Sequence, residues 1–478
     1  MDRITARQST VQERAAAGRQ RRDQVPVSAH THWRPAPGRP DPVALIQAQN
    51  RTRDPDLVPV RHGRMLASPF TFFRGTAGIM AADLREVPRA GLTTQLCGDA
   101  HLSNFGIFGS PERALVFDIN DFDETLPGPF EYDVLRLAAS FTVAARNNAF
   151  TEGDVRAVTL SAVRAYREAM RGFARMGTLE VWYAGLDEQD LMSILSLAVD
   201  SSRGKAEKKA ARHARRKAGK ATRKARSRDS LQALAKLAEQ VDGEYRIISS
   251  PPVLVPAREF GTLFGISADQ LQETVRAQFR AYRQTLQEDR RRLLERYEIV
   301  DVARKVVGVG SVGTRAFVAL LQGRDAADPL FLQLKEARRS VLEDHLPRSV
   351  YRQPGKRVVQ GQRMMQAASD IFLGWTPGMQ EDRYLYWRQL RDMKGSAAVE
   401  TMVPFGMELY ARVCGWALAR AHARSGDPVA IAAYLGKSSK FDASVAAFGA
   451  RYADQNEKDY EAFARAVASG QLEALEGV

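Results

Sequence analysis

The sequence has very few cysteines, because Cys97 and Cys414 are the only two among 478 residues. Two thiols cannot form a disulfide framework or a cysteine-rich zinc cluster. A chain without disulfides suits a reducing compartment, so we expect a cytoplasmic location. Long apolar runs are also missing, since no stretch approaches the ~18–20 residues that span a bilayer. We therefore expect no membrane partner.

Acidic residues are too few to balance the charge: 70 Lys and Arg stand against 56 Asp and Glu, giving a formal net charge of +14. One run, from Arg203 to Arg228, contains thirteen Lys or Arg and a single acid, Glu207. The alanines between these charges favour a helix. We interpret the run as a solvated helix or a mobile linker between lobes; the alternative is binding of a nucleotide, a nucleic acid or another polyanion. The absence of aromatic residues argues against single-stranded nucleic acid.

The composition divides the chain into four segments. Residues 1–40 are basic and carry almost no apolar periodicity, so we predict a disordered tail. Residues 41–300 are mainly helical in pattern, and Asp41 can cap a first helix that starts with Pro42. Residues 301–400 have the pattern of strands and turns, which predicts a small antiparallel-sheet lobe. Residues 401–478 are helical again and are expected to complete the large lobe.

Residues 97–123 carry the groups that point to a chemistry. The stretch begins Cys-Gly-Asp-Ala-His-Leu-Ser-Asn-Phe-Gly, which places Asp99 and Asn104 on a turn-rich loop. A second acidic group follows a short strand: Asp118, Asp121 and Asp123. A carboxylate beside an attacking hydroxyl, with an Asn and an Asp that can hold Mg²⁺, is the equipment of phosphoryl transfer. We predict Asp99 and Asn104 as catalytic residues, and Asn104 together with one of the aspartates that follow as the Mg²⁺ ligands.

A glycine-rich segment lies much further along the chain. The pattern Gly-x-Gly-x-x-Gly follows a short strand and is followed by strand, turn and strand. A dinucleotide-binding fold would place a helix after the glycines, whereas a glycine-rich hairpin with a lysine on the next strand is typical of kinases. We predict that five residues bind the phosphates of ATP: Gly308, Gly310, Ser311, Gly313 and Lys335.

The kinase arrangement also requires a Glu on the following helix to pair with the strand lysine. No acid occurs over residues 345–369. Gln360 and Gln362 lie on the expected helix and offer amides that can accept a hydrogen bond but add no charge. Glu343 and Asp344 are the alternatives, although they lie close to the lysine in sequence. The partner of Lys335 is therefore open.

The catalytic stretch resembles that of aminoglycoside phosphotransferase-like kinases, whose loop has the pattern His-Gly-Asp-x-His-x-x-Asn. Cys97 stands where their first His stands. In those kinases a Tyr-Asp pair follows the metal-binding Asp at a fixed distance, and Tyr132-Asp133 falls at that distance from Asp121. The resemblance therefore favours Asp121 over Asp118 as the metal ligand.

Longer motifs are distributed over nearly all of the chain beyond the tail. They are Met65-Leu-Ala-Ser-Pro-Phe, Phe73-Arg-Gly, Asp118-Ile-Asn-Asp-Phe-Asp-Glu-Thr, Pro127-Gly-Pro-Phe-Glu-Tyr-Asp, Phe331-Leu-Gln-Leu-Lys-Glu-Ala, Gln389-Leu-Arg-Asp-Met-Lys-Gly-Ser and Tyr452-Ala-Asp-Gln, together with the catalytic stretch. In combination they resemble the bacterial "domain of unknown function 2252" family. That resemblance implies family membership but names no substrate.

The order of the motifs is unusual, because ordinary kinases place the glycine-rich loop and its lysine before the catalytic loop, and here Asp99 precedes Gly308. The expected fold is therefore α+β: a two-lobed, protein-kinase-like fold, circularly permuted, with a mostly helical large lobe and a small antiparallel-sheet lobe. ATP and Mg²⁺ would bind between the lobes.

The kinase resemblance implies a phosphotransferase that depends on ATP and Mg²⁺ and acts on a hydroxyl or amine of an unknown acceptor. We expect a small-molecule acceptor rather than a protein. Two alternatives stay open. The missing acid opposite Lys335 and the unusual Cys97 suggest a non-catalytic nucleotide-binding regulator, and the basic run over residues 203–228 suggests a protein that binds nucleic acid or another polyanion.

Overall fold

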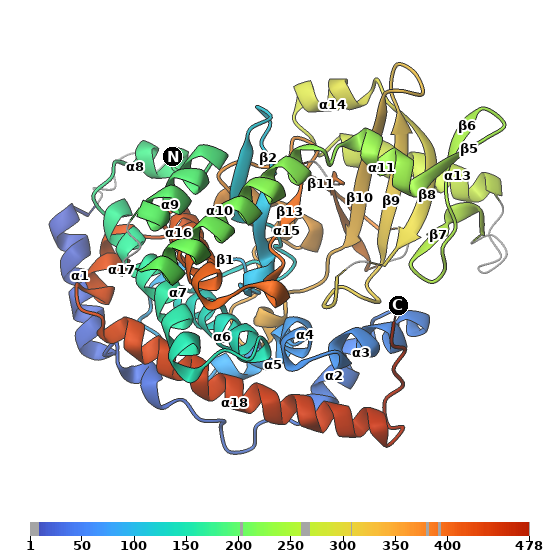
Figure 1. Ribbon diagram of the computed structural model, residues 1–478. Coiled ribbons are helices and arrows are strands. Elements are labelled where there is room, and N and C mark those ends of the chain that lie inside the picture. Colours follow the sequence, from blue (N-terminus) through green and yellow to red (C-terminus); the bar gives the residue numbers. More distant parts are fainter. Residues whose placement is uncertain are drawn as a thin grey trace.

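The computed structural model describes residues 9–200, 204–259, 268–306, 308–378, 382–390 and 393–477. Helices predominate over strands and the strands pair in antiparallel fashion, so the expected mixed α+β class is confirmed. Figure 1 shows one large sheet on one side of the molecule and a body of helices on the other. Within the described ranges, every helix is too short or too polar to cross a membrane.

The large sheet has six antiparallel strands in the order β11-β12-β10-β9-β8-β7. Their bounds are Leu254–Pro256 (β7), Glu298–Lys305 (β8), Ala316–Gln322 (β9), Pro329–Glu336 (β10), Gly374–Pro377 (β11) and Tyr384–Gln389 (β12). Helix α11 (Ser230–Leu237) packs on one face, and α13 (Ala268–Arg283) and α14 (Glu288–Leu294) contribute to the core on the other. On that second face Tyr282 stacks on Trp387, with ring centroids 4.4 Å apart.

The sheet layer begins earlier in the chain than the expected boundary at residue 301. That boundary falls inside β8, and β7, α11 and α13 already belong to the layer. The sequence pattern shows that a helix has an apolar face, but it does not say which layer that face covers. Helices that pack on the sheet were therefore assigned to the helical lobe.

The helical part is centred on α6 (Glu131–Asn147), which is buried along almost its whole length. The helices around it are α7 (Glu152–Phe173), α16 (Pro404–Ser425), α17 (Pro428–Leu435) and α18 (Lys440–Ala468). Helices α7 and α16 approach closely, because a Cβ on Gly415 would lie 2.2 Å from the carbonyl oxygen of Ala162. The C-terminal helices thus share one hydrophobic core with residues 131–173.

The N-terminal segment differs from the prediction. Residues 1–8 lie outside the described residues, but residues 9–40 are structured rather than a disordered tail. Helix α1 (Val11–Gln24) packs against α17, where a Cβ on Gly18 would lie 2.1 Å from the carbonyl oxygen of Ala430. Arg14 and Asp427 form an ion pair at 2.7 Å. The helix docks through glycine and charge rather than through an apolar stripe, so hydrophobic periodicity could not detect it.

Four helices follow before the catalytic stretch. They are α2 (Pro42–Asn50), α3 (Val58–Leu66), α4 (Pro69–Gly75) and α5 (Ala77–Leu84). Asp41 caps α2 by accepting a hydrogen bond from the Ala44 N–H at 2.9 Å, as the sequence predicted. Ser68 caps α4 in a capping box with Thr71.

The remaining strands are short and form three small sheets. They are β1 (Thr93–Leu96), paired with β4 (Leu126–Pro129); β2 (Phe105–Gly109), paired with β3 (Leu115–Ile119) and β13 (Gly395–Ser396); and the hairpin of β5 (Ala238–Val241) and β6 (Glu244–Ile247).

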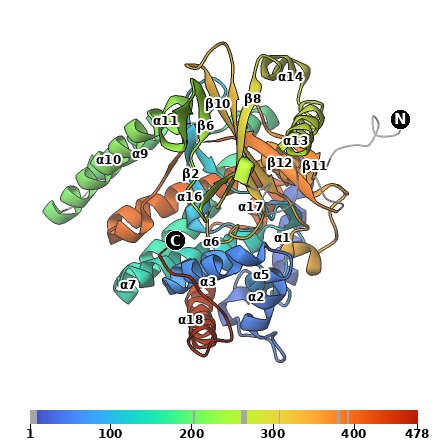
Figure 2. The same cartoon turned by 90° about the vertical axis from the view of Figure 1, so that its right-hand side faces the viewer.

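The basic run forms helix α10 (Lys205–Arg226), which follows α9 (Glu188–Asp200). Ala211, Thr222 and Ala225 are buried, whereas the Lys and Arg side chains of the helix are exposed. Figure 2 shows α9 and α10 running side by side along one side of the molecule. Arg203 lies outside the described residues.

Candidate functional site

Asp99 and Asn104 lie on the loop between β1 and β2. This loop passes close to the turn that follows β3, because a Cβ on Gly98 would lie 2.2 Å from the carbonyl oxygen of Glu124. Gly98 also has a φ of +84°, so the position requires glycine. The side-chain N–H of Asn104 donates to the carbonyl oxygen of Asp99 at 2.9 Å. The loop therefore fixes the two predicted residues next to each other.

Asp133 on α6 anchors this loop. Its carboxylate accepts hydrogen bonds from the backbone N–H groups of Cys97 and Gly98 at 2.8 and 3.0 Å, and it lies 3.2 Å from Nε2 of His422. The Tyr-Asp pair that set the sequence register thus has a structural role. Burial raises the pKa of the Cys97 thiol well above its usual range, and nearby carboxylates add to the effect, so this cysteine is not an activated thiolate.

The carboxylate of Asp99 is oriented by a buried arginine on α6. The Nε of Arg136 donates to Oδ1 of Asp99 at 2.7 Å, and the other carboxylate oxygen lies 3.8 Å from Nε2 of His101. Burial lowers the pKa of His101 to about 3, so the imidazole is neutral and contributes no charge near neutral pH.

The three aspartates after β2 have different surroundings. Asp118 is buried and forms an ion pair with Arg420 at 2.5 Å, and it also accepts the Ala367 N–H at 2.8 Å. It therefore fastens β3 to α16. Asp121 and Asp123 follow the strand and are partly exposed to the cleft described below. This agrees with the preference for Asp121 over Asp118 as a candidate ligand.

Lys335 on β10 reaches the same two aspartates. Its Nζ lies 2.5 Å from Oδ2 of Asp123 and 3.8 Å from Oδ2 of Asp121, and its side chain is 3% exposed. Tyr386 is the register partner of Lys335 on β12, and its hydroxyl donates to Oδ1 of Asp123 at 2.6 Å. Burial alone would lower the pKa of Lys335, but the carboxylates of Asp121 and Asp123 raise it above the usual lysine value. The lysine is therefore a buried cation paired with the turn that carries Asp121 and Asp123, called the acidic turn below.

The partner of Lys335 thus comes from the catalytic stretch and not from helix α15 (Pro354–Met365). The amide N–H of Gln362 donates to a neighbouring glutamine, and Glu343 lies 3.8 Å from Arg357. Arg357 itself donates to the carbonyl oxygen of Asp123 at 2.8 Å. The helix where a glutamate was sought instead carries an arginine that supports the acidic turn, and the carboxylates that pair with Lys335 are those of Asp121 and Asp123.

The glycine-rich segment connects β8 and β9 and covers the acidic turn. Gly308, Gly310 and Ser311 line the cleft, and the Ser311 hydroxyl lies 3.4 Å from Oδ2 of Asp123. Gly308 and Gly313 have φ values of +67° and +81°, which glycine adopts without strain. Val307 lies outside the described residues.

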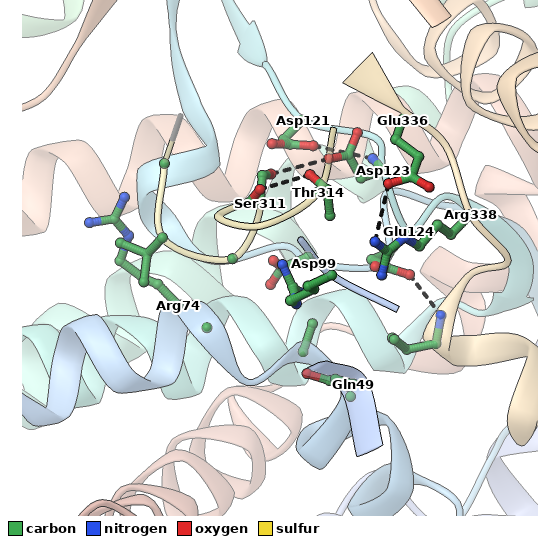
Figure 3. Close-up of a pocket in the computed structure, with 18 of the residues that line it drawn as sticks. Gln49, Arg74, Asp99, Asp121, Asp123, Glu124, Ser311, Thr314, Glu336 and Arg338 are labelled. Carbon is green, nitrogen blue, oxygen red and sulfur yellow. Dashed lines mark hydrogen bonds and ion pairs between the residues drawn. The ribbon is translucent and has the colours of Figure 1, made fainter. Parts of the chain in front are cut away.

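These parts enclose a cleft with a volume of about 270 Å³. Asp99, Asn104 and Asp121 lie on its walls together with the glycine-rich loop. Figure 3 shows Asp121, Asp123 and Ser311 above Asp99, with Arg338 and Glu124 on one side and Arg74 on the other. Lys335 is not exposed to the cleft and acts through Asp121 and Asp123.

A family model described as "Uncharacterized protein conserved in bacteria (DUF2252)" matches residues 53–466. The chain belongs to this family. No curated protein and no solved structure matches the chain. The matched residues include all the residues of the cleft that the sequence singled out and exclude α1.

Several residues of the candidate site were not predicted. Tyr386 lies in an aromatic strand, and the pairing of β10 with β12 would have been needed to place it beside Lys335. Arg53 and Arg338 line the cleft from segments distant in sequence. Glu124 follows the acidic turn, and burial raises its pKa. Only Glu124 carried a local signal, its place directly after Asp123.

The side-chain oxygens of Asn104 and Asp121 fit Mg²⁺ only if a bound ligand supplies further oxygens to the ion. Asn104 and Asp121 both line the cleft. Within the described part of the chain, no group of three or more His, Cys, Asp or Glu is placed to hold a metal ion. Mg²⁺ commonly takes one or two protein oxygens and completes its shell with water and substrate phosphates. Asn104 and Asp121 therefore suit a magnesium ion that arrives with a nucleotide.

Between β12 and β13, Arg391 and Asp392 lie outside the described residues. On either side of them, the Leu390 N–H donates to the Phe331 carbonyl oxygen at 2.9 Å and the Met393 N–H donates to the Arg228 carbonyl oxygen at 2.8 Å. β13 pairs with β2, which directly follows the loop of Asp99 and Asn104.

Proposed function

We propose that this protein is a phosphotransferase that uses ATP and Mg²⁺, built on a circularly permuted kinase-like arrangement. One observation carries the proposal: Lys335, from the strand after a glycine-rich hairpin, lies 3.8 Å from Asp121, and Asp121 shares a cleft with Asp99 and Asn104. Strand lysine, metal aspartate, catalytic aspartate and asparagine are the set that phosphoryl transfer uses.

Each residue has a role in the proposed reaction. The backbone N–H groups of the glycine-rich loop would bind the ATP phosphates, and Asn104 and Asp121 would hold Mg²⁺, which would neutralise charge on the transferred group. The acceptor oxygen or nitrogen forms a bond to the γ-phosphorus while the bond from that phosphorus to the bridging oxygen breaks and ADP leaves. Asp99, oriented by Arg136, takes the acceptor's proton.

The permuted order is compatible with this geometry. An active site depends on where side chains meet and not on their order along the chain. β8, β9 and β10 form consecutive antiparallel neighbours that present the glycine-rich loop and Lys335, as the first three strands of a kinase do, although they follow the catalytic loop in sequence. This supports the permutation proposed from the motif order.

A second candidate is a nucleotide-binding regulator without catalysis. The observation in its favour is that Lys335 pairs with Asp123 at 2.5 Å instead of with a helix glutamate. The exposed basic face of α10 separately supports a polyanion-binding role, which can coexist with either activity because α10 does not line the cleft.

Nucleotide binding is the first test. ATP with Mg²⁺ should raise the melting temperature, since a ligand at a hundredfold excess over its Kd stabilises the native state by about 2.7 kcal/mol. Asp121→Asn should weaken this response, whereas Asp23→Asn, an exposed carboxylate on α1, should not. No response to ATP, ADP or GTP with Mg²⁺ would refute the proposal.

Turnover separates the enzyme from the regulator. Asp99→Asn removes the base but keeps its shape, so ATP should still bind while phosphoryl transfer falls by about 10²–10⁴-fold. The measurement is ADP release with a broad panel of acceptors. Wild-type protein that binds ATP with Mg²⁺ and transfers phosphate to no acceptor would favour the regulator, and full activity in Asp99→Asn would remove Asp99 from the mechanism.

A further inference from the structure

One end of the cleft contains a crowded group of arginines that the proposed reaction does not use. Arg53, Arg61 and Arg338 form this arginine cluster. Arg61, on α3, is completely buried and donates to Asn50 Oδ1 at 2.7 Å and to the Gly75 carbonyl oxygen at 2.9 Å. Its surroundings are neutral acceptors, so no carboxylate compensates its charge directly.

The other two members of the cluster line the cleft. Arg53 donates to the carbonyl oxygen of Val312 in the glycine-rich loop. Arg338 donates to the Thr52 carbonyl oxygen at 2.5 Å and to Oε2 of Glu336 at 3.1 Å. The Nε atoms of Arg53 and Arg338 are buried and have no hydrogen-bond partner among the described residues. Buried donors of this kind are normally satisfied by a protein group, a water or a ligand.

The charge of the arginine cluster is not balanced. Burial lowers the pKa of Arg53 to about 10, and the positive charge of Arg338 adds to the effect, although the carboxylates of Glu124 and Glu336 oppose it. Burial lowers the pKa of Arg61 as well, and the charges of Arg53 and Arg338 contribute. Among the described residues, Glu336 is the carboxylate bonded directly to the cluster, and it also binds Arg383 at 2.5 Å. Like charges held this close favour the binding of an anion between them.

We propose that Arg53 and Arg338 bind a phosphate or carboxylate group of the acceptor, so that the acceptor is an anionic metabolite. This inference rests on the proposed phosphotransferase function. Guanidinium groups suit such an anion because their planar N–H pairs match its oxygens. The acceptor's reacting hydroxyl or amine would then lie toward Asp99, which lines the same cleft.

Two features favour the acceptor over the nucleotide as the anion. The nucleotide phosphates already have the glycine-rich loop and the metal ligands, and neither Arg53 nor Arg338 forms an ion pair with Asp121 or Asp123. The cluster also repels cations, so it selects against polycationic acceptors such as aminoglycosides. The likeness of the catalytic loop to aminoglycoside kinases therefore does not extend to the acceptor.

The anion site can be tested without knowing the acceptor. Inorganic phosphate should raise the melting temperature of the wild-type protein, both alone and when ADP and Mg²⁺ are present at saturation. Arg53→Gln and Arg338→Gln should abolish this phosphate response, and Arg53→Lys should weaken it. Arg348→Gln changes an exposed arginine outside the cleft and should retain it.

Stability without ligand distinguishes a binding role from a structural one. Because the cluster repels itself, Arg53→Gln and Arg338→Gln should melt at or above the wild-type temperature when no anion is present. A phosphate response equal in all variants, or absent in the wild-type protein, would overturn the anion site. A clear loss of melting temperature in both Gln variants without anion would assign the arginines a structural role.

Two further measurements separate this inference from the proposed function. The affinity for ATP with Mg²⁺ should stay within twofold of wild type in Arg53→Gln, whereas a tenfold loss would assign the cluster to the nucleotide and overturn the acceptor assignment. Phosphoryl transfer should be faster to the anionic acceptors glycerol 3-phosphate or glycerate than to neutral glycerol or cationic kanamycin. If phosphate binds as expected but ATP with Mg²⁺ does not, the proposed function fails while the anion site remains. If ATP with Mg²⁺ binds but the phosphate response is unchanged in the arginine variants, the anion site fails while the proposed function remains.

Discussion

The two aspartates beside Lys335 should contribute differently, and substituting each by asparagine tests this. Asp123 is hydrogen-bonded on both oxygens: Lys335 and Ser311 lie at 2.5 and 3.4 Å from Oδ2, and Tyr386 donates to Oδ1 at 2.6 Å. An asparagine at position 123 must point its amide N–H at one of these donors. Asp121 lies 3.8 Å from Lys335 and accepts only the backbone N–H of residue 123, at 3.2 Å.

The expected magnitudes follow from burial. Lys335 is 3% exposed, and breaking a buried ion pair by removing one partner costs about 3–5 kcal/mol. Asp123 is 27% exposed and Asp121 stays nearby, so we expect Asp123→Asn to cost about 2–3 kcal/mol. Asp121→Asn removes a longer and more exposed interaction, and we expect a cost below about 1 kcal/mol.

Urea unfolding measures both effects through the transition midpoint and its slope. The pairing itself is measured by a double-mutant cycle with Lys335→Met, in which the double variant should recover about 1–2 kcal/mol relative to the sum of the single changes. Equal destabilisation by Asp121→Asn and Asp123→Asn, or strict additivity in the cycle, would refute the assigned pairing. In the proposed enzyme the functional order is reversed, because Asp121→Asn is the change that should weaken binding of nucleotide with Mg²⁺.

Two other predictions concern regions away from the cleft. Burial against Phe441 lowers the pKa of His30 from 6.5 to about 4, so stability that is present above pH 6.5 should be lost as the pH falls toward 4, by up to about 3 kcal/mol. His30→Phe keeps the aromatic contact, and its urea midpoint should fall less than that of wild type between pH 7 and pH 4.5; an equal fall would show that His30 does not titrate as described. Replacing the exposed Lys and Arg of α10 by Gln should leave phosphoryl transfer within twofold of wild type, because the helix does not line the cleft. Because we interpret this run as a solvated helix or a linker, we also expect the affinity for a short DNA duplex to depend on salt equally in both proteins; a salt dependence that becomes weaker in the Gln variant would show that α10 binds the polyanion.

The parts of the site that are local in sequence were predictable. Three features could be recognised from neighbouring residues alone. They are the spacing of Asp99 and Asn104, the three glycines of the glycine-rich loop, and the position of Lys335 inside an apolar strand. The antiparallel hairpin that carries the glycines was recognisable for the same reason, since strand, turn and strand follow one another without interruption.

The parts that depend on long-range packing were not predictable. The partner of Lys335 was sought on the following helix, but it comes from Asp123, which lies 212 positions away in sequence. Helix α1 was predicted to be part of a disordered tail. Its contacts with α17 use Gly18 and an ion pair, and such contacts leave no hydrophobic period in the sequence that would reveal them. In each case the missing information was which surfaces meet, and a single sequence does not contain it in local form.

Residues that precede Asp99 in sequence contact two different parts of the molecule. Residues 9–40 fasten α17 and α18 from outside, through the ion pairs of Arg14 with Asp427 and of Arg39 with Asp459. The segment that follows holds the glycine-rich loop: the Asp54 N–H donates to the Gly313 carbonyl oxygen at 2.8 Å, and Arg64 donates to that of Gly308 at 2.5 Å. These hydrogen bonds occupy carbonyl oxygens of the loop and restrain its backbone. The loop is thus held by residues that precede Asp99 in sequence, and in the proposed enzyme this contact would keep the phosphate-binding and catalytic segments in one unit.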